Sequence, residues 1–245
     1  MARAFVATVS SLTVAAAALT AAPFTMACWY QVTSTGTPQN LVTLSSGAIQ
    51  NRFLLQHTGG NRITAFAVAG GSASGATTTT GTSADTWTHA CGVFAANNDR
   101  RAFINGGSKG TNTTTRTPAG INAFAIAENG AGVKEVTGRV AEVAIWNVAL
   151  SDAEVAVLSG GLPHILMRPD ALVRYWPLWG RHDPEIQLVG GTDSLTLNGS
   201  PAAANHAPVA IRTKGRFYPV DHSALGFALL HSPLMLVNLG RMMRK

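Results

Sequence analysis

Hydrophobic and polar residues alternate over short stretches of this chain, and turn residues separate the stretches. A period of two predicts strands that turn one face to a core. Gly59-Gly60-Asn61 and Asn105-Gly106-Gly107 are typical of hairpin turns. After an N-terminal strand, the predicted strands span 24–33, 41–45, 52–57, 62–69, 86–95, 100–104, 110–115, 122–127, 133–146, 172–178 and 195–199, with a loop and an exposed strand over 70–83. This pattern predicts an all-β sandwich of two antiparallel sheets.

One short helix is predicted over 152–158. Ser151 stands three residues before Glu154 at the head of an apolar run, which is the spacing of a capping box. Gly160 and Gly161 follow the run and end the helix.

The stretch 138–161, GRVAEVAIWNVALSDAEVAVLSGG, resembles the closing segment of laminin-G-like, concanavalin-A-like jelly-roll domains. Shorter matches to that family lie around Trp87 and His89, and around Asn105 and Gly106. The resemblance implies a jelly-roll sandwich. It also implies that the tryptophans at positions that match core positions of the family are buried, namely Trp29, Trp87 and Trp146.

The order of the strands distinguishes this chain from many members of that family. The segment LVRYWPL at 172–178 and the later LTLNG at 195–199 precede the jelly roll in many relatives, whereas here they follow it. We therefore expect one sandwich domain over 1–209, in which 172–209 supplies permuted strands. This order also resembles that of bacteriophage structural proteins. The first 24 residues imitate a secretory signal, but polar residues interrupt the apolar run and favour a structural strand.

Charge is scarce and unevenly distributed. Charged residues make up 12% of the chain, about half the usual share of ~25%. Residues 1–209 hold 12 basic and 11 acidic side chains, whereas 210–245 hold six basic ones and only Asp221. The body therefore lacks the basic footprint of a nucleic-acid-binding protein. Cys28 and Cys91 both lie in predicted strands, and their pairing in a disulfide and their burial as free thiols both stay open.

The C-terminal segment 210–245 is basic and apolar. Its apolar run, 224–240, has 17 residues and contains His231, Pro233 and Asn238. A membrane span needs ~20 apolar residues, so a membrane anchor is disfavoured. We expect a docking arm that contacts neighbouring subunits, with packing against its own domain as the alternative. The expected docking residues are Arg212, Lys214, Arg216, Leu225, Phe227, Leu229, Leu230, Leu234, Leu236, Arg241 and Arg244.

Motifs for catalysis are absent from the sequence. There is no E-x-D-x-x-E pair of glucanase carboxylates, no G-x-S-x-G and no G-x-x-x-x-G-K-[ST]. The seven histidines form no H-x-x-x-H or Cys/His cluster. The sequence therefore predicts a protein that is not an enzyme and has no resident cofactor, with calcium left open.

Two loops carry candidate ligand-binding residues. Asn97, Asn98 and Asp99 supply oxygens that suit calcium, or else form an Asx-turn before the next strand. Trp179, with Arg181 and Asp183 beside it, is the best candidate for a sugar contact. The competing interpretation makes Trp179 a rim residue that closes the core.

Two hypotheses for function follow. The first is a bacteriophage virion structural protein, such as a capsid decoration, head-fibre or tail component, made in the host cytoplasm. It would dock on other virion proteins (capsid or tail subunits) and on copies of itself. The second is a secreted or cell-surface carbohydrate-binding adhesin that binds host surface glycans, with or without calcium.

Overall fold

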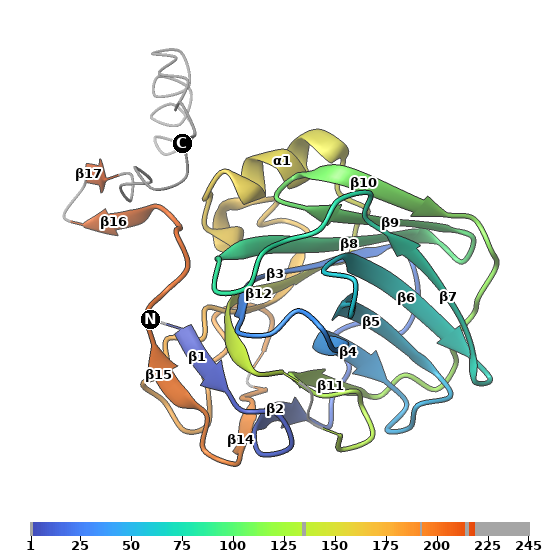
Figure 1. Ribbon diagram of the computed structural model, residues 1–245, viewed down its shortest axis with the longest axis horizontal. Coiled ribbons are helices and arrows are strands. Elements are labelled where there is room, and N and C mark those ends of the chain that lie inside the picture. The colour runs from blue at the N-terminus through green and yellow to red at the C-terminus, as the bar shows by residue number, and fades with distance from the viewer. Residues whose placement is uncertain (1, 134–135, 192, 214–215, 219–245) are drawn as a thin grey trace.

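The alternating stretches form two large antiparallel sheets in the computed structural model, which describes residues 2–133, 136–191, 193–213 and 216–218 (Figure 1). Sheet A has the order β10 (Gly107–Asn112), β9 (Asp99–Ile104), β8 (Thr88–Ala96), β3 (Phe24–Val32), β12 (Gly138–Trp146), β1 (Ala2–Phe5) and β15 (Ala202–Ala204), and β13 (Leu172–Trp176) also pairs with β12. Sheet B has the order β14 (Thr196–Asn198), β2 (Ser11–Val14), β11 (Ala123–Ile126), β4 (Gln39–Ser45), β5 (Arg52–His57), β6 (Ile63–Ala69) and β7 (Ser72–Thr77). The predicted all-β sandwich is confirmed.

The remaining described elements are short. They are α1 (Asp152–Ser159), the 3-10 helix η1 (His164–Leu166) and the paired strands β16 (Ile211–Thr213) and β17 (Arg216–Tyr218). The capping box forms as predicted, because the Ser151 hydroxyl accepts from the Glu154 N–H at 3.3 Å and the Ser151 N–H donates to Glu154 Oε2 at 2.7 Å. The predicted hairpin between β9 and β10 also forms, with positive φ at both Asn105 and Gly106.

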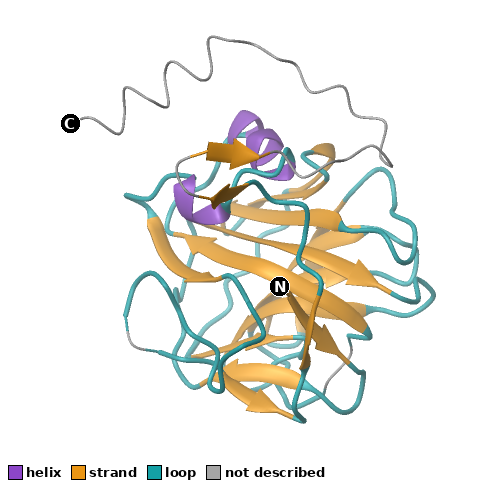
Figure 2. Cartoon of the chain, turned by 90° about the vertical axis from the view of Figure 1, so that its left-hand side faces the viewer, coloured by secondary structure: helices purple, strands orange, loops and turns teal. Residues whose placement is uncertain are grey.

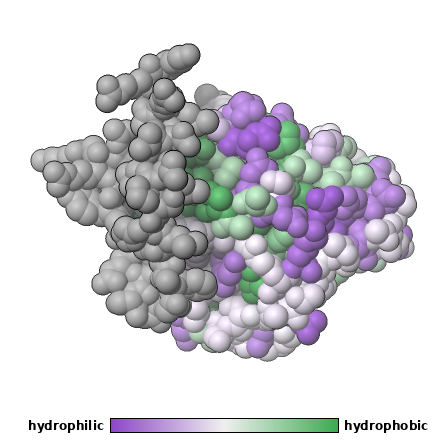
Figure 3. Space-filling view, turned by 90° about the horizontal axis from the view of Figure 1, so that it is seen from above, coloured by the Kyte–Doolittle hydropathy of each residue, from purple (hydrophilic) through white to green (hydrophobic). Residues whose placement is uncertain are grey.

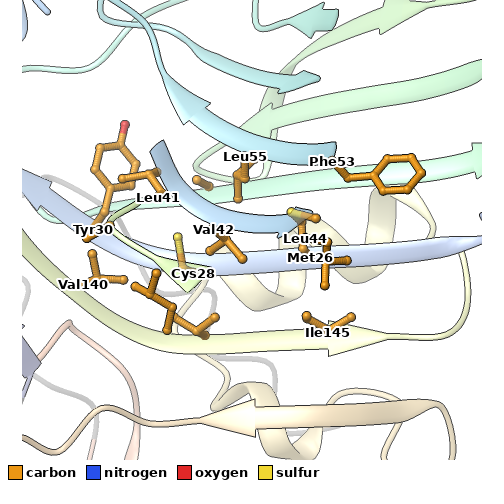
Figure 4. Packing of buried hydrophobic residues seen from close by; sticks show 14 of the residues in the cluster. Met26, Cys28, Tyr30, Leu41, Val42, Leu44, Phe53, Leu55, Val140 and Ile145 are labelled. Carbon is orange, nitrogen blue, oxygen red and sulfur yellow. The ribbon is translucent and has the colours of Figure 1, made fainter. Parts of the chain in front are cut away.

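The main hydrophobic core lies between the two sheets. Val42 and Leu55 from sheet B face Met26, Cys28 and Ile145 from sheet A (Figure 4). Aromatic rings fill the space further along the sandwich. Phe24 stacks on Phe94 with ring centroids 4.5 Å apart, and Phe124 stacks on Trp176 at 4.6 Å.

A second hydrophobic cluster covers the outer face of sheet A. There α1 and η1 pack over the sheet, and the buried Trp146 donates from Nε1 to the Met167 carbonyl at 2.7 Å. Trp29 is buried on the same face, as the family resemblance implied, whereas Trp87 is only half-buried. Seen from the α1 side, the surface mixes hydrophilic and hydrophobic residues (Figure 3).

The two cysteines lie on adjacent strands and do not pair. In the β3–β8 register, Cys28 is opposite Ala90 and Cys91 is opposite Ala27. Since successive strand residues point to opposite faces, Cys28 lies in the core between the sheets and Cys91 lies on the outer face of sheet A. Burial raises the pKa of both thiols, which keeps them protonated and unreactive.

Strands from the two ends of the chain build one side of the sandwich together. The N-terminal segment forms two strands rather than the single expected one, with β1 in sheet A and β2 in sheet B (Figure 1). Figure 2 shows the side of the sandwich on which the N-terminus lies. From the segment after α1, β13 and β15 join sheet A and β14 joins sheet B. Strand β12 pairs with β1 over its first half and with β13 over its second half, and Glu142 with φ +54° lies at the change of partner.

Candidate functional site

The candidate site lies on the segment between β13 and β14, which crosses the open side of the sandwich from sheet A to sheet B. We call residues 177–189 the edge loop. Its later part is tied to both sheets, because the Leu188 N–H donates to the Tyr175 carbonyl at 2.9 Å, and Glu185 and Leu195 exchange backbone hydrogen bonds at 2.9 and 3.0 Å. The loop is therefore fixed by the same kind of bonds that hold a strand.

A buried arginine anchors the edge loop from inside. Arg3 Nε donates to Glu185 Oε2 at 2.7 Å, and both side chains are buried. The same guanidinium donates to the carbonyl of Pro201 at 2.7 Å and to the carbonyl of His182. Charge-assisted bonds of this kind are about twice as strong as neutral ones, so Arg3 holds the loop in one position relative to β1.

The backbone of the loop passes very close to the edge of sheet A at Gly180. Gly180 has φ +69°, and a Cβ there would stand 2.8 Å from the Ala203 Cα and 3.0 Å from the Ala2 carbonyl oxygen. Only glycine fits this approach. The tight passage leaves the residues on either side, Trp179 and Arg181, on the solvent side of the loop.

The three predicted sugar-contact residues all lie on the edge loop and are exposed. Trp179 is 40% exposed, and the side chains of Arg181 and Asp183 are exposed as well. Within the described residues neither the Arg181 guanidinium nor the Asp183 carboxylate has a hydrogen bond or an ion pair. An aromatic face can pack on the C–H face of a sugar ring, and free charged groups can bind its hydroxyls.

The edge loop also exposes an apolar pair that the sequence analysis missed. Glu185 and Gln187 point inward and are buried, whereas Ile186 and Leu188 point outward with 39% and 41% exposure. Strand-like alternation with polar residues inside is the reverse of the usual pattern. Polar and apolar residues alternate over 185–188 in the sequence, but the alternation alone does not say which set is buried. The ion pair between Arg3 and Glu185 shows that the polar set points inward.

The predicted calcium loop is already occupied by arginine contacts. Asp99 accepts two hydrogen bonds from Arg101, at 2.6 and 3.1 Å. The Asn97 carbonyl accepts from the Arg100 guanidinium at 2.8 Å and from the Arg116 N–H at 2.9 Å. Among the residues that the structure describes, no group of three or more His, Cys, Asp or Glu side chains could hold a metal ion. The structure thus gives Asn97, Asn98 and Asp99 no carboxylate-rich set of ligands for calcium.

Most of the predicted docking residues lie outside the described part of the chain. Of that set, Arg212 lies in β16 and Arg216 in β17, and in their register Arg212 is opposite Phe217 and Thr213 is opposite Arg216. The others, Lys214, Leu225, Phe227, Leu229, Leu230, Leu234, Leu236, Arg241 and Arg244, lie outside the described residues. Where the structure is described, none of its helices has the length and apolar character to span a bilayer.

The acidic side chains of the sandwich that are buried take part in structural contacts. Glu128 accepts from the Ser11 hydroxyl at 2.8 Å and from the Gly132 N–H at 3.0 Å. Glu142 accepts from the Tyr175 hydroxyl at 2.7 Å, and Glu185 binds Arg3. Each carboxylate is held by its own neighbours and none is presented to solvent as a free acid or base.

Three histidines that no sequence motif links come together on the outer face of sheet A. We call the following residues the histidine cluster: His89, Glu142, His164, Tyr175 and His206. His89 and His164 are fully buried, with their Nε2 atoms 3.2 Å apart. The His206 Nε2 atom lies 3.3 Å from Glu142 Oε1. No spacing in the sequence signals this cluster, because its members come from four separate elements and one loop.

The sequence of residues 7–156 matches the concanavalin A-like lectin/glucanases superfamily. The chain belongs to this family. The matched residues include β2 to β12 and the first half of α1, while the edge loop and two of the three clustered histidines lie beyond them. None of the curated proteins compared with the sequence matches it significantly.

Solved structures share the lectin-like fold at low sequence identity. A candidate carbohydrate-binding protein from Bacteroides ovatus is 18% identical, with a TM-score of 0.56 over 83% of this chain and 61% of that one. A heptameric SAP-like pentraxin from Limulus polyphemus is 13% identical, with a TM-score of 0.52 over 64% and 81%. Domain 4 of AbnA, a GH43 extracellular arabinanase from Geobacillus stearothermophilus solved with arabinotriose, is 19% identical, with a TM-score of 0.50 over 58% and 68%. At these identities the likeness concerns the fold.

Proposed function

We propose that this chain is a non-catalytic carbohydrate-binding domain and that its edge loop contacts the sugar. The observation that carries the proposal is the exposed Trp179 with the unpaired Arg181 and Asp183 beside it, on a loop that Arg3 fixes from inside. A rigid loop loses little conformational freedom on binding. The same class of ligand is supported by the lectin/glucanases family to which the chain belongs. It is also supported by two structural neighbours, the arabinanase domain solved with arabinotriose and the candidate carbohydrate-binding protein from Bacteroides ovatus.

The absence of catalysis is part of the proposal. A glycosidase needs two carboxyl groups that face each other across the scissile bond. In the described residues, the buried Glu128, Glu142 and Glu185 are each bound to structural partners. Asp183 is exposed but has no second free carboxylate beside it on the edge loop.

Glycan arrays followed by titration calorimetry test this function. We expect Trp179→Ala to abolish retention on the glycans that the wild-type chain binds, because the ring supplies the stacking surface. Val157→Ala is the matched control, since Val157 is also 40% exposed but lies on α1. Retention that survives Trp179→Ala, or that is lost equally in Val157→Ala, would contradict the proposed site. Repeating the array with a calcium chelator tests whether the ion takes part.

A virion structural role is the second candidate. Two observations favour it, namely the outward-facing Ile186 and Leu188 on the edge loop and the basic, apolar sequence of 210–245. In this role the C-terminal segment 210–245 would bury apolar surface against capsid subunits or subunits of the phage tail. Burial of apolar surface stabilises such a contact by ~25 cal/mol per Å².

Light scattering after size exclusion tests the second candidate. Full-length protein is compared with residues 1–210, which keep the hydrogen bond from Ala210 N–H to the Gly161 carbonyl. Self-association of the full chain alone, together with loss of particle incorporation on truncation, is the expected result. Identical monomers would remove the basis for this role.

A further inference from the structure

The histidine cluster joins two parts of the chain that the family comparison separates. His89 on β8 and Glu142 on β12 belong to the matched jelly roll, residues 7–156. His164 on η1, Tyr175 on β13 and His206 after β15 come from the segment beyond it. Every polar contact in the cluster that crosses this boundary involves an ionisable side chain.

The groups that meet at the cluster come from both layers. Sheet A contributes Trp29 on β3, His89 and the buried thiol of Cys91 on β8, Glu142 and Trp146 on β12, and Tyr175 on β13. The segments that cover this face, η1 and residues 205–210, are called the covering layer, and they contribute His164 and His206.

The surroundings of the two central imidazoles are apolar. His89 contacts the ring of Trp29 at a centroid distance of 5.4 Å, and His164 contacts Trp146 at 5.8 Å. Burial lowers the pKa of His89 well below its usual value, and repulsion from His164 adds to this effect. Burial also lowers the pKa of His164, to about 4, although Glu142 partly opposes the shift. In the folded chain near neutral pH, the two rings are therefore an uncharged hydrogen-bonded pair.

The Nε2 atoms of a neutral pair share one proton, with one ring as donor and the other as acceptor. If both rings are protonated, two donors face each other at 3.2 Å with charges that burial leaves poorly solvated. The carboxylate of Glu142 can compensate only one of them, and it already accepts from Tyr175 and lies next to His206. The contact between His89 and His164 is therefore lost when both rings become protonated.

Among the described residues the covering layer has few other bonds to the sheet near the cluster, and the main one runs from Trp146 Nε1 to the Met167 carbonyl at 2.7 Å. Residues 205–210 pack through Ala207 and Val209, which are small side chains, against Trp29 and Ala141. Away from the cluster, Ala210 is bonded to Gly161 within the covering layer itself. In contrast, β13 is held to β12 by a strand ladder. Protonation would consequently release η1 and 205–210 before it separates β13.

We propose that the histidine cluster is an acid-sensitive latch that holds η1 and residues 205–210 on sheet A, and that acidification frees these segments and the chain that continues from them. The latch acts whatever ligand the edge loop binds. It couples the position of the C-terminal segment to the acidity of the surroundings.

Hydrogen–deuterium exchange of the full-length chain, corrected for the intrinsic effect of pH on exchange, tests the latch. Between pH about 7.5 and about 5, rings freed by opening take up protons although the closed pair does not. We therefore expect exchange in peptides covering 160–167 and 205–210 to rise about tenfold or more, while β4, β5 and β6 stay protected. His164→Gln removes one titrating ring, so its opening should move to lower pH. His89→Gln should do the same, and serves if His164→Gln does not fold.

His57→Gln is the control variant, because His57 is also buried but lies on β5 in sheet B. It should leave the opening of 160–167 and 205–210 at the wild-type pH. The latch is overturned if these peptides and sheet B lose protection at the same pH, since that is global acid unfolding. It is also overturned if the folded glutamine variants open at the same pH as the wild-type chain.

Discussion

At the residue scale, Arg3 makes contacts that no local pattern in the sequence could reveal. It pairs with Glu185 across 182 positions of sequence and also binds two carbonyls of the segment that closes the sandwich. A single charged residue near the N-terminus thus determines how a loop near position 180 meets solvent. The geometry of the candidate site and the stability of that side of the sandwich depend on the same side chain.

Replacing Arg3 by methionine should therefore cost the chain both stability and loop order. The change leaves the Glu185 carboxylate buried without a partner, and removal of one member of a buried ion pair typically costs ~3–5 kcal/mol. Urea unfolding measures the free energy. Arg101→Met is the matched control, because its pair with Asp99 is partly exposed and should be worth about 1 kcal/mol or less. Equal losses in the two variants would show that the Arg3 pair contributes nothing beyond a surface contact.

At the element scale, the strands and the helix were predictable because their signals are local. Alternation identifies β3, β5 and β12, and the Ser151–Glu154 spacing identifies the start of α1. Pairings between distant elements were not predictable. The register that separates Cys28 from Cys91 and the meeting of His89 with His164, 75 positions apart, depend on tertiary packing. The residues proposed to contact sugar adjoin in sequence, so the sequence could suggest them together, whereas Arg3, which anchors their loop, lies 182 positions from its partner Glu185.

The capping box gives a prediction for a single element. Ser151→Ala removes the acceptor for the Glu154 N–H, and loss of such a cap costs ~1 kcal/mol. Ser159→Ala at the other end of α1 is the control, since its hydroxyl only adds a bond to the Ala156 carbonyl. Thermal or urea unfolding compares the two variants. A smaller loss for Ser151→Ala than for Ser159→Ala would contradict the importance of the cap.

The contact between β10 and β7 on the opposite side of the sandwich gives a second prediction. A Cβ at Gly110 would stand 1.8 Å from the Thr77 carbonyl oxygen, whereas a Cβ at Gly107, on the same strand, meets nothing within 4 Å. Gly110→Ala must push the two strands apart, and such overpacking costs ~1–3 kcal/mol or more. Gly107→Ala should be nearly neutral. Urea unfolding of both variants decides the matter, and similar stabilities would mean that β7 and β10 are not held together as described.

At the scale of the whole molecule, buried ionisable groups make the fold more stable in neutral than in acidic solution. Burial lowers the pKa of His57, His89 and His164 in the folded chain. In Glu142 burial opposes ionisation, but His206, whose Nε2 lies 3.3 Å away, the charge that His164 acquires in acid and the Tyr175 hydroxyl outweigh it and lower the pKa. All four groups are thus held in the form that dominates at neutral pH.

The free energy of unfolding should therefore decrease as the pH falls. The unfolded chain exposes its histidines, which take up protons below pH about 6.5, whereas in the folded chain His164 does so only near pH 4. Within that window the unfolded state binds more protons, and each extra proton costs ~1.4 kcal/mol of stability per pH unit. Below it, protonation of Glu142 removes stability further. Urea unfolding at a series of pH values measures the slope, and His164→Gln should reduce it. A stability that is flat or rises on acidification would show that these histidines are not buried as neutral groups.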